Sequence, residues 1–216
     1  RSVGVRLTFE GVGRVRELEL SSGRILATPH AAQGGRTSVP TSIPALGVRV
    51  FELDLTTEPE PVVDLPQDDA VELTLEAWHL RVLSEEPAGP RTIELDGVAL
   101  GDWRKIESLG GVSGTGRYTV RVALRDERLA GLPARIDLGA LAGSAVVSIG
   151  GRIFGTAYVD DTVIDLGDSI TDGIEIEIEV RTALRNAVIE ADISDLFDQD
   201  SSQPQGLIGP VRLLVN

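Results

Sequence analysis

The sequence predicts an all-β protein whose antiparallel strands pack as a sandwich. Apolar and polar residues alternate with a period of two over eight segments, which puts the apolar side chains of each strand on one face. Turn residues recur about every 8 to 12 positions between them, for example in "GGVSGTG" at residues 110–116. No segment has a convincing amphipathic helical pattern, although residues 126–132 and 190–197 have room for a helical turn or two. The predicted strands are residues 3–10, 14–20, 47–55, 70–83, 117–124, 134–139, 145–151 and 174–184.

The strongest of these strands is "IEIEIEV" at residues 174–180. A strand places its isoleucines on one face and Glu175, Glu177 and Glu179 on the other, whereas a helix would scatter the isoleucines around its circumference. Three like charges in a row are tolerable only on a face that meets water. We therefore expect one buried and one solvated face here.

The best domain boundary is "TTEPEPVVDLPQDD" at residues 56–69, which contains three prolines, five acidic residues and no basic one. It divides the chain into an N-terminal β segment, residues 1–60, and a longer unit, residues 61–216. We interpret residues 1–55 as the end of a preceding small β domain, or as strands that pack onto the second unit. The chain lacks Met, which is typical of a fragment or a processed product.

The charge excludes one class of partner. The formal net charge is −14, and residues 61–216 carry 13 basic against 27 acidic side chains. Such a surface repels a phosphate backbone, so nucleic acid is not an expected partner, whereas neutral or cationic ligands are compatible with it. No apolar run approaches the roughly 20 residues of a membrane-spanning helix, so no membrane partner is expected.

The compartment stays open at this stage. The chain has no Cys, which removes disulfides, thiolate metal sites and cysteine catalysis together. A reducing compartment and a bacterial secreted protein without disulfides both fit this composition. No signal peptide is visible.

One short motif suggests an enzyme. Residues 167–173, "GDSITDG", resemble the sequence around the nucleophilic serine of SGNH-type esterases, which would make Ser169 the nucleophile. Such a serine needs a histidine base, and in that family the base lies near the C-terminal end. Here His30 and His79 both precede Ser169, and 47 residues follow it. We therefore predict that the motif is a hairpin turn between two strands and keep the esterase as a remote alternative.

A second resemblance covers most of the chain. Five motifs occur in the order and spacing of the jelly-roll sugar-binding-type domain of family-2-like glycoside hydrolases, a module also appended to large α-L-rhamnosidases. They are "SGTGRY" (113–118), "IDLG" (136–139), "VSIGGRIFG" (147–155), the stretch at 164–186 that contains "GDSITDG", and "GLIGPVRL" (206–213). The resemblance implies a jelly-roll, galactose-binding-like β-sandwich preceded by a short β segment.

The resemblance also implies a role. The region would be a non-catalytic carbohydrate-binding or accessory module of a glycoside hydrolase, with glycan as a candidate ligand and catalysis in a separate domain of the same polypeptide. The alternative is a purely structural domain without a ligand. Departures from the family pattern, such as Gly150-Gly151 in place of Asn-Gly and Ile174 in place of Asn, favour the loss of some sugar contacts.

Four residues are candidate ligand contacts. Trp103 follows a loop and could stack on a sugar ring, with burial beneath the loop as the alternative. Tyr158, Asp160 and Asp161 lie in a loop where carboxylates could accept hydrogen bonds from hydroxyl groups, with a solvated acidic turn as the alternative. Trp78 lies in an alternating strand and is expected in the core.

A structural calcium ion is the one candidate cofactor. The segment 190–205 contains five acidic residues and no basic one, and calcium prefers oxygen ligands of this kind. The segment lacks the fixed ligand pattern of an EF-hand, so an ordinary acidic loop is the alternative. No other metal or cofactor is expected.

Overall fold

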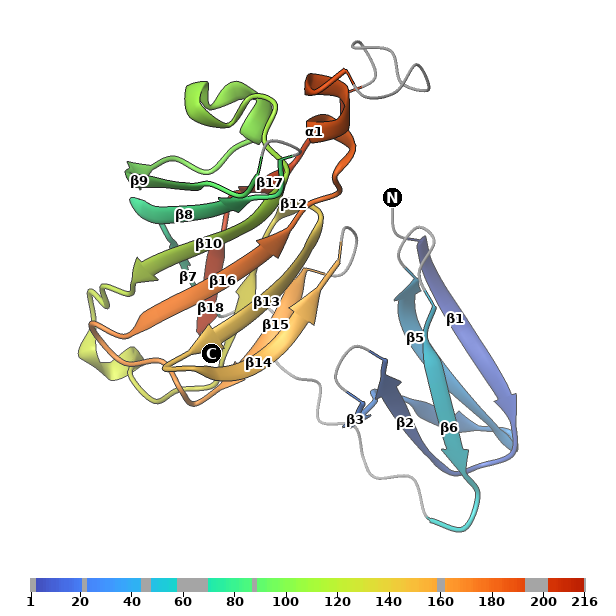
Figure 1. Cartoon of the computed structure of the whole chain (residues 1–216). Coiled ribbons are helices and arrows are strands. Elements are labelled where there is room, and N and C mark those ends of the chain that lie inside the picture. Colours follow the sequence, from blue (N-terminus) through green and yellow to red (C-terminus); the bar gives the residue numbers. More distant parts are fainter. Residues whose placement is uncertain are drawn as a thin grey trace. The chain divides into compact units, whose positions relative to one another are not determined.

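The structure is a computed structural model that describes residues 3–20, 23–43, 48–57, 70–86, 89–158, 162–192 and 202–215. The chain divides into two compact units, Arg1–Asp69 and Ala70–Asn216 (Figure 1). This division falls at the C-terminal end of the acidic, proline-containing segment 56–69. Each unit is described separately below.

The first unit consists of two three-stranded antiparallel sheets. One has the order β1 (Val3–Glu10), β5 (Arg36–Ile43), β4 (Ala31–Gln33), and the other β3 (Arg24–Ala27), β2 (Arg14–Glu19), β6 (Val50–Asp54). Val15 and Val39 are its fully buried apolar side chains among the described residues. At the end of β6, the carboxylate of Asp54 accepts hydrogen bonds from the hydroxyls of Thr56 and Thr57 and from the Thr56 amide, which hold its pKa well below its usual range.

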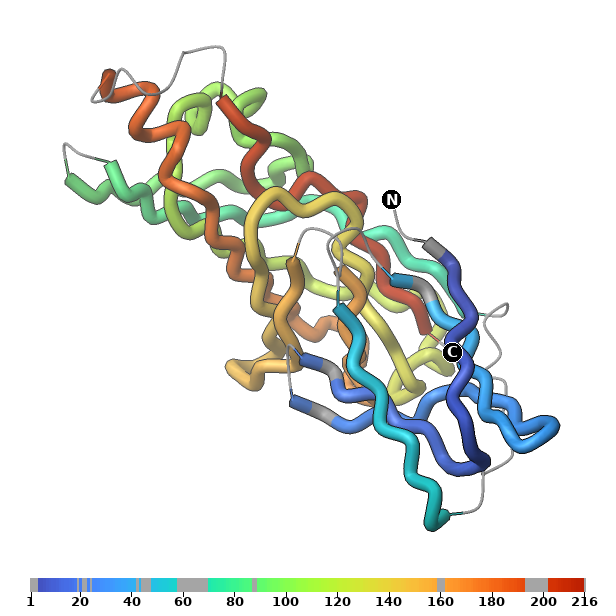
Figure 2. The backbone as a smooth tube through the Cα atoms, turned by 90° about the vertical axis from the view of Figure 1, so that its right-hand side faces the viewer, coloured from blue at the N-terminus to red at the C-terminus, as the bar shows by residue number. Residues whose placement is uncertain are grey.

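The second unit is an antiparallel β-sandwich, which confirms the predicted all-β class. The two main sheets have six and four strands, and a two-stranded sheet joins β12 (Ala140–Ala142) to β17 (Gly206–Gly209). The six-stranded sheet has the order β14 (Arg152–Ala157), β13 (Ser144–Ile149), β16 (Glu175–Arg181), β10 (Gly114–Arg121), β8 (Trp78–Ser84), β9 (Thr92–Val98). The four-stranded sheet has the order β15 (Val163–Gly167), β11 (Ala134–Asp137), β18 (Arg212–Val215), β7 (Val71–Thr74). In Figure 2 the C-terminal β18 runs beside β11, its partner in this sheet.

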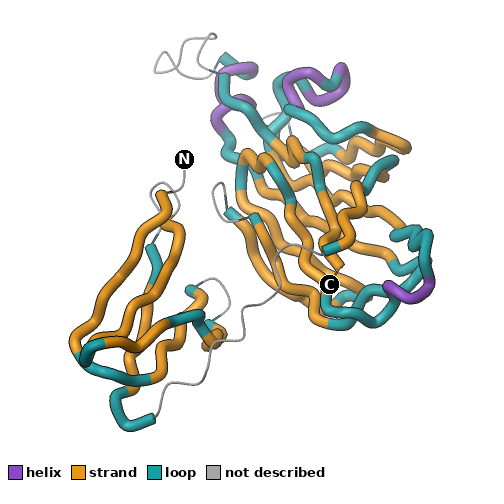
Figure 3. The backbone as a smooth tube through the Cα atoms, turned by 180° about the vertical axis from the view of Figure 1, so that it is seen from behind, coloured by secondary structure: helices purple, strands orange, loops and turns teal. Residues whose placement is uncertain are grey.

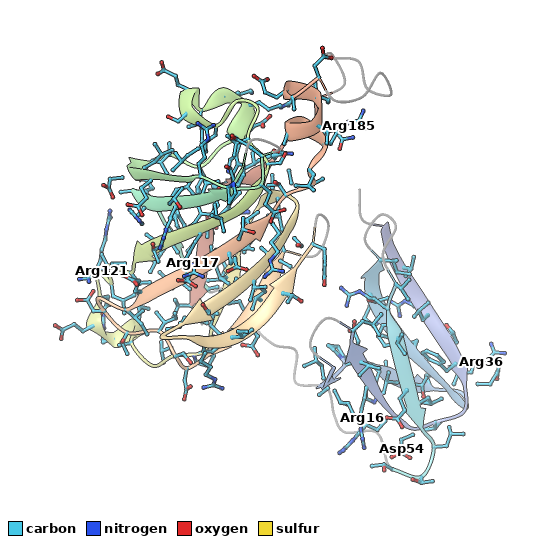
Figure 4. The ribbon with its side chains drawn as sticks, in the orientation of Figure 1. Arg16, Arg36, Asp54, Arg117, Arg121 and Arg185 are labelled. Carbon is cyan, nitrogen blue, oxygen red and sulfur yellow. The ribbon has the colours of Figure 1, made fainter. Side chains whose placement is uncertain are left out.

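Strand β16 has the two faces that its sequence predicts. Ile176, Ile178 and Val180 are fully buried between the sheets. The glutamates face outward, where Arg117 and Arg121 of the neighbouring β10 form ion pairs with them (Figure 4). Hydrogen bonds from Arg181 and Arg117 outweigh the effect of partial burial and lower the pKa of Glu179. The row of like charges is thus neutralised across the strands as well as solvated.

The motif "GDSITDG" connects the two sheets and does not form a hairpin. Strand β15, before it, pairs with β11 in the four-stranded sheet, whereas β16, after it, pairs with β10 and β13 in the six-stranded sheet. The expected hairpin at this point is therefore wrong, because the two flanking strands hydrogen-bond to different partners. The hairpin expected at Gly150-Gly151 is present between β13 and β14, and both glycines have positive φ angles, +56° and +80°.

Short helices gather at one end of the second unit. Helices η1 (Trp103–Lys105), η2 (Glu107–Leu109) and α1 (Arg185–Glu190) lie at that end, and η3 (Glu127–Leu129) lies at the other (Figure 3). Helix η3 falls within residues 126–132, one of the two segments with room for a helical turn. Helix α1 ends at Glu190, the first residue of the other segment, 190–197, and residues 193–197 lie outside the described residues. Within the described part of the chain, no helix has the length and apolar composition to cross a membrane.

Trp103 anchors the helical end to the core. Its indole N–H donates a hydrogen bond of 2.5 Å to the hydroxyl of Tyr118 on β10, and the amide of Leu207 donates to the same oxygen at 3.2 Å. The indole packs directly against the backbone of Gly206 and Gly116. A Cβ atom added at Gly206 would lie 2.2 Å from the indole nitrogen.

We predict that Gly206→Ala destabilises the protein more than Gly131→Ala. Both glycines have positive φ angles, so the backbone strain of an alanine, roughly 1–2 kcal/mol, is common to the two variants. Only Gly206 lacks room for a methyl group, and overpacking of this kind costs about 1–3 kcal/mol more. Urea denaturation followed by tryptophan fluorescence measures the difference, and equal losses in the two variants would contradict the packing argument.

Candidate functional site

Trp103 has no surface available for a sugar. Its side chain is fully buried, with 0% of its area exposed, and a stacking platform needs an exposed ring face. The predicted role of Trp103 as such a platform is therefore wrong, because Gly116, Gly206 and Tyr118 enclose the indole. Trp78 is buried as predicted, and its ring meets that of Tyr118 edge to face.

Tyr158 follows β14 and is 54% exposed, so its ring is accessible. Asp160 and Asp161, its expected partners, lie outside the described residues. A ligand site formed by these three residues therefore stays a prediction. The register places Tyr158 at the same end of the six-stranded sheet as the three clustered helices, because Ala157 pairs with Ala145 near the start of β13.

Ser169 and the two histidines belong to separate parts of the described structure. Ser169 is half-buried after β15, where its amide donates to the carbonyl of Leu166. His79 lies on β8 in the other sheet, with its Nδ1 2.6 Å from Asp96, and His30 belongs to the first unit. A side chain that fixes this turn is that of Asp172, which accepts a hydrogen bond from the amide of Leu124.

A hollow of about 710 Å³ opens at the helical end of the sandwich. It lies where β8 ends and where β9 and β10 begin, beside η2 and α1. We call it the end hollow. Its lining consists of Glu86, Arg91, Glu107, Ser108, Gly110, Gly111, Val112, Ala187, Glu190 and Ala191.

The end hollow contains three carboxylates and one guanidinium among its lining groups. Glu86 and Arg91 form an ion pair, with 2.8 Å between the carboxylate and the terminal guanidinium nitrogen. The side chain of Glu190 lies against Gly111 so closely that a Cβ atom at this glycine would be 2.8 Å from the Glu190 carboxylate oxygen. The absence of a side chain at Gly111 therefore makes room for the Glu190 carboxylate.

A smaller apolar hollow of about 410 Å³ adjoins the end hollow and shares Glu86 and Ala187 with it. Pro90, Leu184 and Val188 supply its apolar lining. The two hollows together combine hydrogen-bonding groups with an apolar wall, which is the usual composition of a small-molecule site.

A buried polar network positions the walls of the end hollow. The amide group of Gln205 donates to the Ser113 hydroxyl at 3.0 Å and to the Ala183 carbonyl at 2.7 Å, and the Ala187 amide donates to the same hydroxyl. Asn186 exchanges two hydrogen bonds with the backbone of Gln203, at 2.8 and 2.9 Å. These bonds fix α1 against the start of β10 and against the strand that leads to the C-terminus.

Asp102 fixes the position of η1, the helix that precedes η2 of the end hollow. Its carboxylate accepts hydrogen bonds from the side chain and amide of Arg104 and from the amide of Gln205. Burial alone would raise the pKa of Asp102, but these hydrogen bonds outweigh it and lower the pKa below the ordinary value of 3.8. Arg104 also donates to the carbonyl of Ser202 at 2.9 Å. The ion pair therefore connects the loop before η1 to the C-terminal segment.

Little in the sequence indicates this hollow. Its carboxylates come from three distant segments, and only "GGVSGTG" at residues 110–116 stood out, as a turn. Among the described residues, no group of three acidic, histidine or cysteine side chains is placed to hold a metal ion. Most of the predicted calcium segment, residues 193–201, lies outside the described residues, so calcium stays a prediction there.

The described residues define a protein of two β units, the second an antiparallel sandwich with a polar hollow at its helical end. No protein-family model and no curated protein matches the chain. A rhamnosidase structure from Novosphingobium sp. PP1Y matches 99% of the chain with 23% identity and a TM-score of 0.77. This likeness shows a shared fold. The chain spans 21% of the length of that rhamnosidase.

Two glycosidase structures match about two thirds of the chain. An FMN-binding β-glucuronidase from Facaelibacterium prausnitzii L2-6 is 22% identical, and the match covers 67% of this chain and 22% of that one, with a TM-score of 0.46. A GH2 β-galacturonidase from Eisenbergiella tayi is 18% identical, with coverages of 68% and 24% and a TM-score of 0.47. Both scores lie below 0.5.

We predict that Asp102→Asn lowers the free energy of unfolding by about 1–2 kcal/mol at pH 7, because it removes a charge-assisted pair with Arg104. The pKa of Asp102 is lower in the folded state, so its contribution is complete above the unfolded value near 3.8 and is lost as the pH falls through the folded value. The difference from the parent protein should therefore shrink below about pH 4.

Urea denaturation at pH 7, 5 and 3.5 measures this dependence. Asp96→Asn is the matched control, since Asp96 is exposed and pairs with His79 at the surface, where such pairs contribute little. A constant difference between Asp102→Asn and the parent protein at all three pH values would contradict the assignment.

Proposed function

We propose that this chain is a non-catalytic, glycan-binding accessory region of a glycoside hydrolase of the α-L-rhamnosidase type, and that the end hollow binds the glycan. The observation that carries the proposal is the fold, which nearly the whole chain shares with one segment of a rhamnosidase. The order of the five sequence motifs supports the same class. The partners would be a glycan and the catalytic domain of the same polypeptide.

The chemistry of the end hollow suits a saccharide. Carboxylates accept hydrogen bonds from sugar hydroxyls, while Arg91 and Ser108 can donate them. The volume of about 710 Å³ lies within the usual range for ligand sites. The described lining residues include no aromatic side chain, so hydrogen bonds rather than ring stacking would provide the recognition. Within this proposal the sandwich is a jelly-roll, galactose-binding-like domain.

A structural role without a ligand is the second candidate. The burial of Trp103 favours it, because this removes the strongest aromatic candidate for sugar binding. Affinity electrophoresis against a panel of neutral polysaccharides, including rhamnose-containing ones, separates the two. Retardation by at least one polysaccharide supports the glycan-binding role, and no retardation by any of them favours the structural role.

We predict that Gly111→Ala weakens glycan retardation severalfold, whereas Gly110→Ala leaves it unchanged. A methyl group at Gly111 would displace the Glu190 carboxylate, whereas Gly110 has open space around its α carbon. Neither glycine requires a positive φ angle, so both variants should retain the fold. Their Tm values, compared with that of the parent protein, check this. Equal retardation of the two variants would exclude the Glu190 side of the hollow as the binding site.

The esterase alternative has a direct test. Neither histidine hydrogen-bonds to Ser169 in the described structure, so we predict no hydrolysis of p-nitrophenyl acetate above the level of Ser169→Ala. A spectrophotometric assay of p-nitrophenolate release provides the measurement. Activity that disappears in Ser169→Ala would establish Ser169 as a nucleophile and overturn the non-catalytic assignment.

A further inference from the structure

The charges of the end hollow do not balance. Among the described lining residues Arg91 is the only cation, and it is already paired with Glu86 at 2.8 Å. This leaves the carboxylates of Glu107 and Glu190 without a compensating cation among the lining groups. On the adjacent η1, the guanidinium of Arg104 is engaged with Asp102 at 2.6 Å.

The position of Glu190 is set by packing. Its Cγ and carboxylate lie in the space that a side chain at Gly111 would fill. Glu107 lies in the first turn of η2, which follows directly on the anchored Trp103–Lys105 helix. The two carboxylates thus come from different helices, one from η2 and one from α1, and both residues line the same hollow.

We propose that the end hollow selects glycans by charge, in that it admits uncharged saccharides and rejects saccharides that carry carboxylates, such as uronic acids. This inference rests on the proposed glycan-binding function. A carboxylate that enters the hollow meets Glu107 and Glu190 at short range, and bringing like charges together in a partly enclosed site is unfavourable. Sugar hydroxyls meet the same oxygens as hydrogen-bond acceptors. Glu107 and Glu190 are therefore specificity-determining residues.

The test compares two ethers of one polysaccharide. The polysaccharide that retards the protein most is used as its hydroxyethyl ether, which is neutral, and as its carboxymethyl ether, which is similar in size and anionic. Affinity electrophoresis or isothermal titration at low ionic strength gives the apparent Kd for each. We expect the carboxymethyl ether to bind about tenfold more weakly. Raising the salt from about 20 mM to 500 mM should reduce this ratio, because it shortens the screening length.

Three variants assign the effect to residues. Glu107→Gln and Glu190→Gln each remove one negative charge from the hollow and keep the shape of the side chain, so each should reduce the tenfold ratio by about half or more. Glu127→Gln removes one charge from the exposed η3, at the opposite end of the sandwich, and should leave the ratio unchanged. This control separates the charge of the hollow from the net charge of the chain.

The outcomes are distinct. Equal binding of the two ethers overturns charge selection and leaves the glycan-binding function intact. A preference for the neutral ether that survives both Glu107→Gln and Glu190→Gln also overturns it, because other charges must then be responsible. Binding of neither ether, and of no polysaccharide in the panel, overturns the glycan-binding function and this inference together.

Discussion

The hydrogen bond from the indole of Trp103 to the hydroxyl of Tyr118 connects the helical end of the second unit to its core. Burial of that hydroxyl raises the pKa of Tyr118, although its two hydrogen bonds act in the opposite direction. The amide of Leu207 uses the same oxygen, so η1, the central strand β10 and the C-terminal β17 meet at one atom. The wall that carries Glu107 starts from this point. A ligand site at this end can have a defined geometry because the helices beside it are hydrogen-bonded to the core through Trp103.

The surroundings of Trp103 also illustrate which features of the fold can be predicted from the sequence and which cannot. Strand β16 was predictable because its isoleucines and glutamates alternate locally, and the alternation alone specifies the two faces. Trp103 was misassigned because its environment is not local: the space for its indole is provided by Gly116 and Gly206, which lie on other strands. The motif around Ser169 connects two strands, but it is not the predicted hairpin, because the sequence does not reveal that the strands on either side belong to different sheets. Strand pairing is a property of the whole fold.

The end hollow was missed for a related reason. Glu86, Glu107 and Glu190 are unremarkable in sequence, where each is one acidic residue among many, and only the fold brings them to one hollow. The clearest local signal was the pair Gly110-Gly111, which we interpreted as a turn. One of these glycines makes space for a carboxylate, and the other does not. The fold therefore gives two adjacent, identical residues different roles, and the difference can be seen only from what lies opposite each of them.

The pairing of Asn186 with Gln203 has a practical meaning for protein engineering. The amide group of Asn186 binds the backbone of Gln203 through both its oxygen and its nitrogen, so the points at which the chain leaves α1 and returns toward β17 are joined independently of the residues between them. Closing a longer connection would cost only about 0.6 kcal/mol for each doubling of its length. The stretch between these two residues is thus a natural place to insert a tag or a fluorescent reporter.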